Sequence, residues 1–309
     1  TSAFSTPGLE AYWDKDIFLT EALTQEAIKT LEQSRSLDKS FFLYMAHYAV
    51  HIPIQKDMRF YQKYKDRGLS DTEAAYSSLV EGMDKSLGDL MDYLERTGQM
   101  DNTIIIFMSD NGGLAASSRT APLGVQNAPL RSGKGSVYEG GVREPMMVYW
   151  KGVAQPGTTQ DQYVIIEDFF PTILEMAQVT DYTTVQPIDG KSFVPLLTGT
   201  ADPSEGRALY WNTPNKWIGG DHRSEGIGQT CAIRQGDYKM VYWYIDGKKE
   251  LYNLAEDIAE SHDLAADHPD IVHQLSRQLG DYLRSVNAQR PTFKATGEPC
   301  PWPDEINAE

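Results

Sequence analysis

Cysteine and positive charge are both scarce in this chain of 309 residues. The two cysteines, Cys231 and Cys300, allow at most one internal disulfide, and their separation does not reveal whether they pair. Lysine and arginine together number 28 against 44 aspartates and glutamates, so the formal net charge is −16. This balance argues against nucleic acid as a partner, because binding to a phosphate backbone depends on clustered cations.

Long hydrophobic runs are also absent. Without about eighteen consecutive apolar residues, no membrane-spanning helix is expected. No signal peptide is visible at Thr1, although a chain that has lost its natural N-terminus would show none. Hydrophobic residues still make up 40% of the sequence, so a chain of this length can bury a sizeable core. We expect a globular protein with one large or two smaller domains.

Apolar side chains that recur every three or four residues predict helices. One of them has a capping-box signature at Ser70 and Glu73, and another carries Pro171 in its first turn. Asp267 is the predicted cap of the last helix, with Pro269 close behind it. The predicted helices cover residues 16–34, 70–98, 167–178 and 267–283.

Short apolar runs bounded by polar residues predict strands, and residues 103–108 form the clearest buried one. A turn-rich stretch over residues 198–206 separates the earlier runs from three later ones. The tail from Arg290, rich in proline, is expected to be irregular. The predicted strands cover residues 41–45, 103–108, 146–150, 231–234, 238–244 and 249–252.

The order of strand, helix and strand indicates an α/β architecture for residues 1–200. Residues 201–309 are expected to form a small α+β subdomain, an antiparallel sheet covered by a helix. In α/β sheets, ligands gather at the carboxyl ends of the strands. Asp110 and Asn111 follow one predicted strand, and His47 and His51 follow another, so a shared site can form there.

The segment Ser109-Asp110-Asn111-Gly112-Gly113 offers a charged and a neutral oxygen to a hard cation. Such ligands suit calcium, or magnesium, better than zinc. Calcium takes about six to eight oxygens, so two residues cannot hold it alone. The alternative is an ordinary turn after a strand, since Asp-Asn-Gly is favourable turn chemistry anywhere.

Lys134 lies between two glycines, which lets the backbone approach a ligand closely. A lysine beside a cation site is suited to hold an oxyanion, which indicates ester hydrolysis at a sulfate or a phosphate. The surrounding stretch holds five basic residues against Glu139 and Glu144, a candidate positive island, although an ordinary basic loop is the alternative. The five are Arg119, Arg131, Lys134, Arg143 and Lys151.

Other polar and aromatic residues near these segments have weaker assignments. Tyr138, Glu139 and Arg143 are expected to orient the lysine by hydrogen bonds or an ion pair, with direct substrate contact by Arg143 as the alternative. His222, in a Gly-rich stretch with Asp221 and Arg223, is a candidate substrate contact. The run Tyr242-Trp243-Tyr244 has strand spacing and is expected to pack, with sugar stacking as the alternative.

These segments closely resemble signature stretches of the calcium-dependent sulfatases, members of the alkaline-phosphatase-like superfamily. The resemblance extends over nearly the whole chain. The matching segments are Asp110-Asn111-Gly112, Gly133 to Pro145, Phe41 to Met45 with His51-Ile52-Pro53, Ile188 to Leu197, and Glu250 to Leu254 with Asp257 and Glu260.

Segments that sulfatases carry earlier in their sequences do not occur here. These are a pair of aspartate metal ligands, a Gly-Lys-Trp-His-like segment, and Cys-x-Pro-Ser-Arg, whose cysteine becomes formylglycine. Cys231 is followed by Ala-Ile-Arg and Cys300 by Pro-Trp-Pro, so neither stands in that motif. The chain therefore resembles the C-terminal portion of a sulfatase, with a partial sulfatase-like mixed sheet flanked by helices.

The resemblance implies a sulfuric ester hydrolase that acts on a sulfated sugar or an aryl sulfate. It assigns Asp110 and Asn111 to the metal, Lys134 to the sulfate, and His51 to the sulfate ester, where an imidazolium donates to the sulfate or assists the leaving alkoxide. It also suggests a periplasmic, secreted or lysosomal protein. The alternatives are a related phosphoester or phosphonate hydrolase, or a non-catalytic remnant that binds sulfated glycan. Alone, the chain is expected to turn over little substrate.

Overall fold

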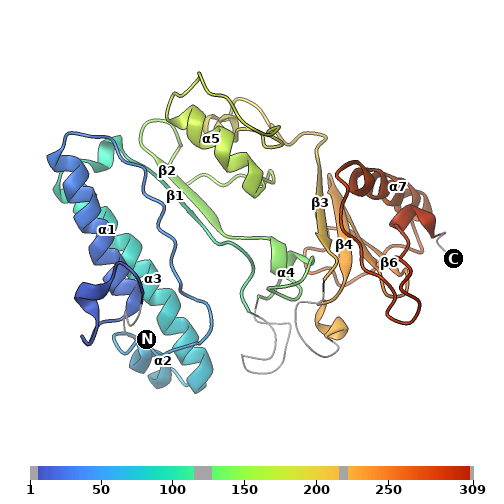
Figure 1. The fold of residues 1–309 in the computed structure, drawn as a ribbon, viewed down its shortest axis with the longest axis horizontal. Helices are drawn as coiled ribbons and strands as arrows, with labels where there is room; N and C mark the ends of the chain where they lie inside the picture. The colour runs from blue at the N-terminus through green and yellow to red at the C-terminus, as the bar shows by residue number, and fades with distance from the viewer. Residues whose placement is uncertain (1–5, 115–126, 216–221, 307–309) are drawn as a thin grey trace. The chain divides into compact units, whose positions relative to one another are not determined.

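The computed structural model describes residues 6–114, 127–215 and 222–306. The chain divides into two compact units (Figure 1). Of the described residues, 6–103 form the first unit, and 104–114, 127–215 and 222–306 form the second. The predicted boundary at residue 200 lies inside the second unit and stays a prediction. No helix in the described part of the chain is long and apolar enough to cross a membrane.

Helices build the first unit, in which α1 and α2 both pack against the long helix α3. The predicted cap is confirmed, because the Ser70 hydroxyl accepts a hydrogen bond from the Glu73 N–H at 3.2 Å. Between α1 and α3, Thr24 Oγ1 lies 2.5 Å from Ser86 Oγ. The helices are α1 (Leu19–Ser36), α2 (Tyr61–Asp66), which the sequence pattern did not predict, and α3 (Asp71–Arg96), with short 3-10 turns η1 (Glu10–Tyr12) and η2 (Met100–Asn102).

The strand predicted over residues 41–45 is wrong. Residues 41–48 are extended, and their side chains alternate between half-buried and exposed, but they pair with no strand among the residues that the structure describes. Phe42 and Tyr44 remain 75% and 81% exposed. The apolar pattern is that of a strand, but a strand also needs a neighbour for its backbone groups.

A two-stranded antiparallel ribbon begins the second unit and confirms two predicted strands. It pairs β1 (Ile104–Met108) with β2 (Met146–Trp150), so that Met108 faces Met146. Every residue of β1 is partly exposed, so the prediction that residues 103–108 form the clearest buried strand was wrong. One face of the ribbon packs on Phe193 and Leu196. The neighbouring helices are η3 (Ile166–Asp168), α5 (Phe169–Met176), α6 (Val194–Thr198) and the one-turn α4 (Glu139–Val142).

The C-terminal sheet, β3 to β6, is antiparallel in the order β3-β4-β5-β6 and is covered by α7 (Figure 1). The three predicted strands are confirmed, and β3 was missed. The predicted cap Asp267 is wrong: His268 precedes the helix, no side chain caps it, and Pro269 is its first residue. The elements are β3 (Ala208–Thr213), β4 (Thr230–Gln235), β5 (Tyr238–Trp243), β6 (Lys249–Asn253), α7 (Pro269–Ser285), and the short η4 (Arg223–Glu225) and η5 (Pro303–Glu305).

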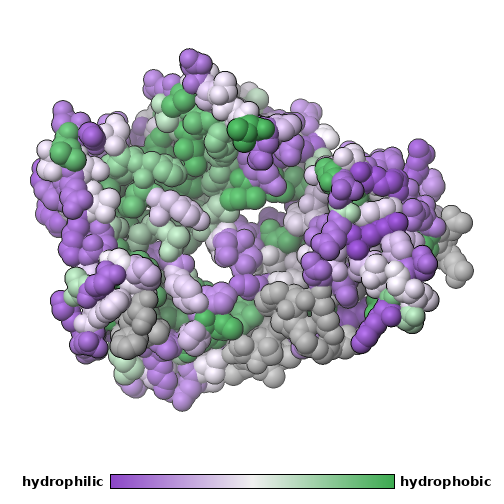
Figure 2. All heavy atoms as spheres, in the orientation of Figure 1, coloured by the Kyte–Doolittle hydropathy of each residue, from purple (hydrophilic) through white to green (hydrophobic). Residues whose placement is uncertain are grey.

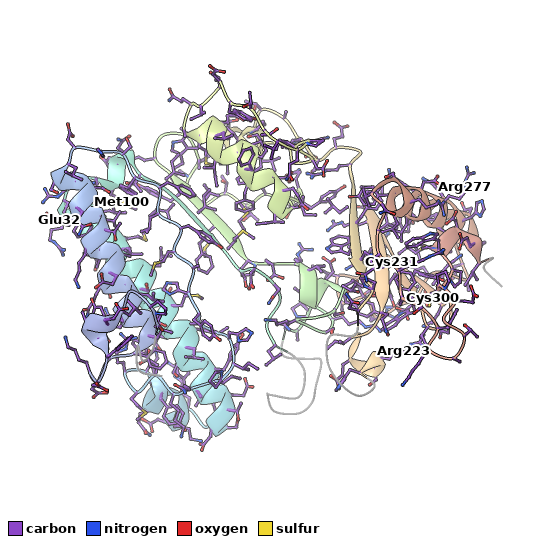
Figure 3. All side chains as sticks on the ribbon, in the orientation of Figure 1. Glu32, Met100, Arg223, Cys231, Arg277 and Cys300 are labelled. Carbon is purple, nitrogen blue, oxygen red and sulfur yellow. The ribbon has the colours of Figure 1, made fainter. Side chains whose placement is uncertain are left out.

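Both cysteines lie in the core between this sheet and α7 (Figure 3). They are buried and unpaired, and burial raises the pKa of the Cys231 thiol to about 12. Tyr242, Trp243 and Tyr244 are at most 3% exposed. Their packing role is thereby confirmed and sugar stacking is excluded, since no ring face is open.

Leu279 anchors α7 on the sheet, and replacing it tests this packing. It is fully buried, whereas the opposite face of the helix is hydrophilic (Figure 2). We expect Leu279→Ala to lower the free energy of unfolding by about 2–5 kcal/mol, because a cavity replaces the lost contacts. The exposed Gln274, changed to alanine, serves as the control and should stay within about 0.5 kcal/mol of the wild type. Urea unfolding measures both, and equal losses would contradict the packing.

Candidate functional site

Asp110 and Asn111 follow β1 directly, as the sequence predicts, and begin the loop that carries the site. Asp110 is exposed and Asn111 is half-buried. The Asn111 amide nitrogen donates to the Gly112 carbonyl oxygen at 3.1 Å. The amide oxygen is therefore the atom that Asn111 can offer to a cation, beside the Asp110 carboxylate.

Backbone hydrogen bonds join this loop to the segment that carries Lys134. We call residues 131–139 the lysine loop. The Lys134 N–H donates to the Gly113 carbonyl at 3.1 Å, and the Gly112 N–H donates to the Gly141 carbonyl at 3.1 Å. The structure thus brings the Asp110 and Asn111 segment together with Lys134, although about twenty residues separate them in the sequence.

Glycines make this approach possible. A Cβ atom at Gly112 would lie 1.8 Å from the Gly140 carbonyl oxygen, and one at Gly140 would lie 2.3 Å from the Arg131 carbonyl oxygen. Within the lysine loop, Gly135 has a φ of 90°, a conformation that glycine adopts without strain. Gly112 therefore permits the close contact between the two loops, whereas Gly140 permits a close contact with Arg131 at the start of the lysine loop.

Asn127 is a residue of the site that sequence reasoning missed. Its side-chain amide donates to the Gly113 carbonyl at 2.9 Å and to the Ser132 carbonyl at 2.8 Å. It therefore fastens the two loops together through a single side chain. No spacing in the sequence singled it out, because its acceptors are backbone atoms on both sides of the contact.

A second carboxyl group, that of Glu144, interacts electrostatically with Asp110. Burial, and then the charge of Asp110, raise the pKa of Glu144 to about 7, and its buried Oε1 has no hydrogen-bond partner in the described part of the chain. A carboxylate that lacks a partner beside a second one fits a place where a cation binds. Within residues 6–114, 127–215 and 222–306, no group of three or more His, Cys, Asp or Glu side chains could hold a metal by itself.

His222 lies on a segment that packs against the lysine loop. Ile227 forms isolated bridges with both His222 and Ser136, and the Ser132 hydroxyl donates to the Glu225 carbonyl. The His222 ring pairs with the Glu225 carboxylate at 3.3 Å. The structure therefore places His222 beside the loop, whereas its neighbour Asp221 lies outside the described residues. Substrate contact by His222 stays a prediction.

His51 belongs to the first unit, and its meeting with Lys134 stays a prediction. Its side chain is exposed, its Nδ1 lies 2.9 Å from the Ile52 carbonyl oxygen, and its ring meets Tyr48 edge-on. His47 is more buried, its Nδ1 has no partner in the described part of the chain, and burial lowers its pKa. His51 is thus the histidine whose ring is open to solvent.

The predicted positive island does not form among its described members. Arg143 pairs with Glu139 at 3.5 Å, and the Arg131 guanidinium lies 3.8 Å from the centre of the Tyr138 ring. Lys151 follows the end of β2 that is remote from Asp110, roughly 23 Å away along the ribbon direction, because the register sets Asp110 opposite Glu144, seven residues before Lys151. Arg119 lies outside the described residues. Arg143 therefore has the scaffold contact that was predicted for it, and its contact with substrate stays a prediction.

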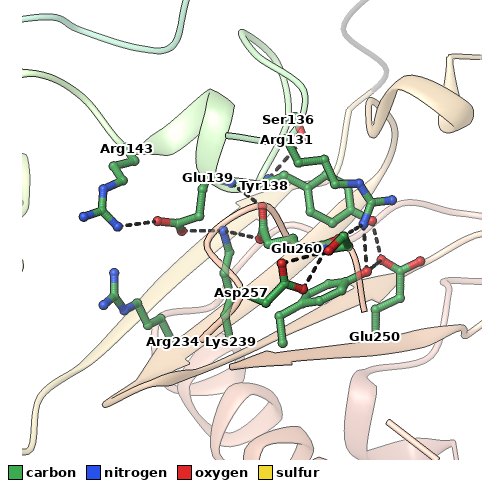
Figure 4. Close-up of polar contacts among 12 residues, drawn as sticks. Arg131, Ser136, Tyr138, Glu139, Arg143, Arg234, Lys239, Glu250, Asp257 and Glu260 are labelled. Carbon is green, nitrogen blue, oxygen red and sulfur yellow. Dashed lines mark hydrogen bonds and ion pairs between the residues drawn. The ribbon is translucent and has the colours of Figure 1, made fainter. Parts of the chain in front are cut away.

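A buried polar network lies behind the lysine loop (Figure 4). Lys239, on β5, is fully buried and pairs with Glu139 at 2.8 Å and Glu260 at 3.0 Å. Beside it, Glu250 accepts hydrogen bonds from the hydroxyls of Tyr138 and Tyr252. Sequence reasoning missed Lys239. The sequence feature that could have identified it is a lysine inside a predicted strand that is otherwise apolar, since residues such as Met240 and Val241 on the two faces of β5 are buried.

Glu250 makes the stability of this network depend on pH. Burial acts to raise its pKa, but hydrogen bonds from Lys248, Tyr138 and Tyr252 outweigh burial and lower it. A lowered pKa in the folded state contributes stability above the unfolded value of about 4.3, and this is lost as the pH falls through the folded pKa. We expect Glu250→Gln to cost about 1–3 kcal/mol at pH 7 and progressively less between pH 5 and pH 3.

Urea unfolding at several pH values measures this difference. The exposed Glu256, changed to glutamine, is the control and should follow the wild type throughout. A penalty for Glu250→Gln that is the same at pH 7 and at pH 3 would show that the Glu250 charge does not contribute.

Comparisons with known proteins agree with this architecture. The sulfatase family profile matches residues 3–179, and a profile for N-sulphoglucosamine sulphohydrolase, C-terminal, matches residues 133–289. A sulfatase of Formosa agariphila is 31% identical and covers 92% of this chain, and human arylsulfatase A is 29% identical and covers 79%. The crystal structure of Ps i-CgsB in complex with k-i-k-neocarrahexaose superposes with a TM-score of 0.76 at 26% identity over 91% of this chain.

The matches cover only part of those proteins. They span 54% of the Formosa agariphila sulfatase, 44% of human arylsulfatase A and 58% of the Ps i-CgsB chain. This chain thus spans about half the length of the curated relatives it matches. Because the family profile matches more than half of this chain, and its mixed α/β fold agrees with the solved neighbour, the chain belongs to the sulfatase family.

Proposed function

We propose that this chain supplies one part of the active site of a sulfuric ester hydrolase that acts on a sulfated sugar or an aryl sulfate. The observation that supports it most is the backbone contact between the Asp110 segment and the lysine loop, in a chain of the sulfatase family. The contact joins the backbone of the segment that offers two oxygen ligands for a cation to the backbone of the residue whose ammonium can bind an oxyanion, which supports a shared site.

Asp110 and Asn111 would hold calcium, or magnesium, through their oxygens. A bound divalent cation would supply charge that stabilises the sulfate group during its transfer, and a hydrated formylglycine, whose motif this sequence does not hold, would supply the hydroxyl oxygen that attacks sulfur. Lys134 donates from its ammonium to the sulfate oxygens and neutralises the charge that develops there. His51 gives a proton to the departing alkoxide, which leaves as the alcohol.

We further propose that the chain has little activity by itself. The sequence holds neither the formylglycine motif nor the paired aspartates of the family, and the extended segment 41–48 exposes Phe42 and Tyr44. An extended, alternating segment suits pairing with a strand, which a complementary N-terminal portion would supply. By its family, such an enzyme works in the periplasm, in the lysosome or outside the cell.

Assaying the chain with an aryl sulfate, alone and after adding an N-terminal segment of a related sulfatase, tests the proposal. We expect turnover only with the added segment and with calcium present. Faster hydrolysis of the matching aryl phosphate or phosphonate would favour the related phosphoester or phosphonate hydrolase. Binding of a sulfated glycan with neither metal nor turnover would favour the non-catalytic remnant, and either result would overturn the proposal.

A further inference from the structure

We infer that Glu260 and Lys239 are positioning residues that hold the lysine loop at both of its ends, so that strand β5 and the segment after β6 set the position of the Lys134 ammonium. The holding of the loop rests on contacts within the second unit. The effect of the loop's position on catalysis rests on the function proposed above.

The far end of the loop is held through Glu139. Lys239 Nζ lies 2.8 Å from Glu139 Oε1 and 3.0 Å from Glu260 Oε1, the second contact being an ion pair without the angle of a hydrogen bond (Figure 4). The Glu139 N–H donates to Glu260 Oε2 at 2.6 Å. The side chains of all three residues are at most 2% exposed, so no water replaces these contacts.

The near end of the loop is held through Arg131. Its guanidinium donates to the Glu260 backbone carbonyl at 2.9 Å and to the Tyr252 hydroxyl at 2.8 Å. The guanidinium carbon also lies over the Tyr138 ring, 3.8 Å from its centre. Glu260 therefore touches both ends of the loop, one through its backbone and the other through its carboxylate.

Residues 132–136 are also held by hydrogen bonds from the Lys134 N–H to Gly113, from Asn127 to Ser132 and from Ser132 to Glu225, none of which involves the Lys134 side chain. Gly133 and Gly135 flank Lys134 and have no side chains to pack. Charged groups buried away from water are costly unless they are well paired, and an apolar cluster of the same volume would often be as stable. A buried charged network of this kind can contribute a single defined conformation rather than stability, and here that conformation is the position of Lys134 in the loop.

The charges of the network are coupled. Burial acts to raise the pKa of Glu139, but the Lys239 ammonium outweighs it and lowers that pKa. Burial raises the pKa of Glu260, and the charge of Glu139 adds to this rise, while Lys239 opposes it. Removing Lys239 would leave two carboxylates facing each other, whereas removing the Glu260 carboxylate leaves Lys239 and Glu139 as a matched pair.

Glu260→Ala in this chain is therefore the variant that tests the inference while sparing the fold. We expect hydrogen exchange at the Lys134, Ser136 and Gly140 amides to rise about tenfold or more, while the amides of β4 and β5 keep their protection. Glu260→Gln should give a smaller rise at the same amides, because its amide oxygen still accepts from the Glu139 N–H while its NH2 group faces the Lys239 ammonium, which is also a donor. Glu256→Ala, at an exposed position of the same segment, is the control and should exchange like the wild type.

Unchanged exchange of the loop amides in Glu260→Ala would overturn the inference, as would an equal rise over the whole sheet. If Glu260→Ala does not fold, Glu260→Gln decides by the same comparison of loop and sheet amides.

In the chain completed by the N-terminal segment, Glu260→Ala should lower kcat on aryl sulfate by about 10²-fold with a smaller change in KM. Faster loop exchange with an unchanged kcat would overturn the catalytic part of the inference alone. Faster loop exchange in Glu260→Ala, together with a completed wild type that hydrolyses no aryl sulfate, would support the holding of the loop and overturn the proposed function.

Discussion

Replacing Lys134 by methionine is expected to lower kcat on aryl sulfate by about 10²–10³ in the chain completed by an N-terminal segment. Methionine keeps the length of the side chain and removes the ammonium, so the sulfate oxygens lose a donor when their negative charge rises. Lys134 is half-buried, and its backbone N–H is bonded to Gly113, so the loop itself should stay in place. KM should change less than kcat, because the charge on the sulfate group increases during its transfer.

A matched lysine provides the control for this prediction. Lys294 is exposed in the proline-rich tail, and Lys294→Met should leave kcat and KM as they are. Urea unfolding of both variants shows whether folding is preserved. A Lys134→Met protein that is folded and hydrolyses aryl sulfate as fast as the wild type would remove Lys134 from the site.

Gly112→Ala is expected to lower the free energy of unfolding of the second unit by about 3 kcal/mol or more. The added Cβ would lie 1.8 Å from the Gly140 carbonyl oxygen and 2.9 Å from the Gly141 Cα. Both neighbours are backbone atoms, which cannot rotate aside as the end of a side chain can. The Gly112–Gly141 and Lys134–Gly113 hydrogen bonds would break as the loops separate.

Gly88→Ala is the matched control, because the same substitution should raise the free energy of unfolding slightly instead of lowering it. Gly88 lies inside α3, and a Cβ there would have no atom within 4 Å. Alanine favours a helix over glycine by about 0.5–1 kcal/mol, so this variant should be slightly more stable than the wild type. Urea unfolding compares the two, and a Gly112→Ala protein as stable as Gly88→Ala would contradict the close approach of the loops.

The sequence predicts best those elements whose signals are local. The helix α3 has a capping residue at Ser70 and a regular apolar stripe, so nearby residues in the sequence predict both where it begins and how far it extends. Residues 41–45 carry an equally clear pattern, but whether they become a strand depends on a partner that the pattern does not contain. The same dependence explains why the pairing of β3 with β4 was not foreseen.

The candidate site shows a similar division. The motif glycines predicted a loop that comes close to a ligand, and in the structure they also bring the Asp110 segment against the lysine loop. The partners of Lys239 and Asn127 could not be predicted from the sequence, because they lie far along the chain or are backbone atoms. The assignment of His51 to the same pocket came from family resemblance and stays a prediction.

We propose that Asp110, Asn111, Lys134 and His51 serve one sulfate site. A crystal structure of the chain completed by an N-terminal segment, with calcium and sulfate bound, tests this proposal most directly. We expect Lys134 Nζ and a ring nitrogen of His51 at hydrogen-bond distance from the sulfate, about 3 Å, with the oxygens of Asp110 and Asn111 on the metal at about 2.4 Å. Sulfate bound elsewhere, or these four side chains on separate surfaces, would contradict the account.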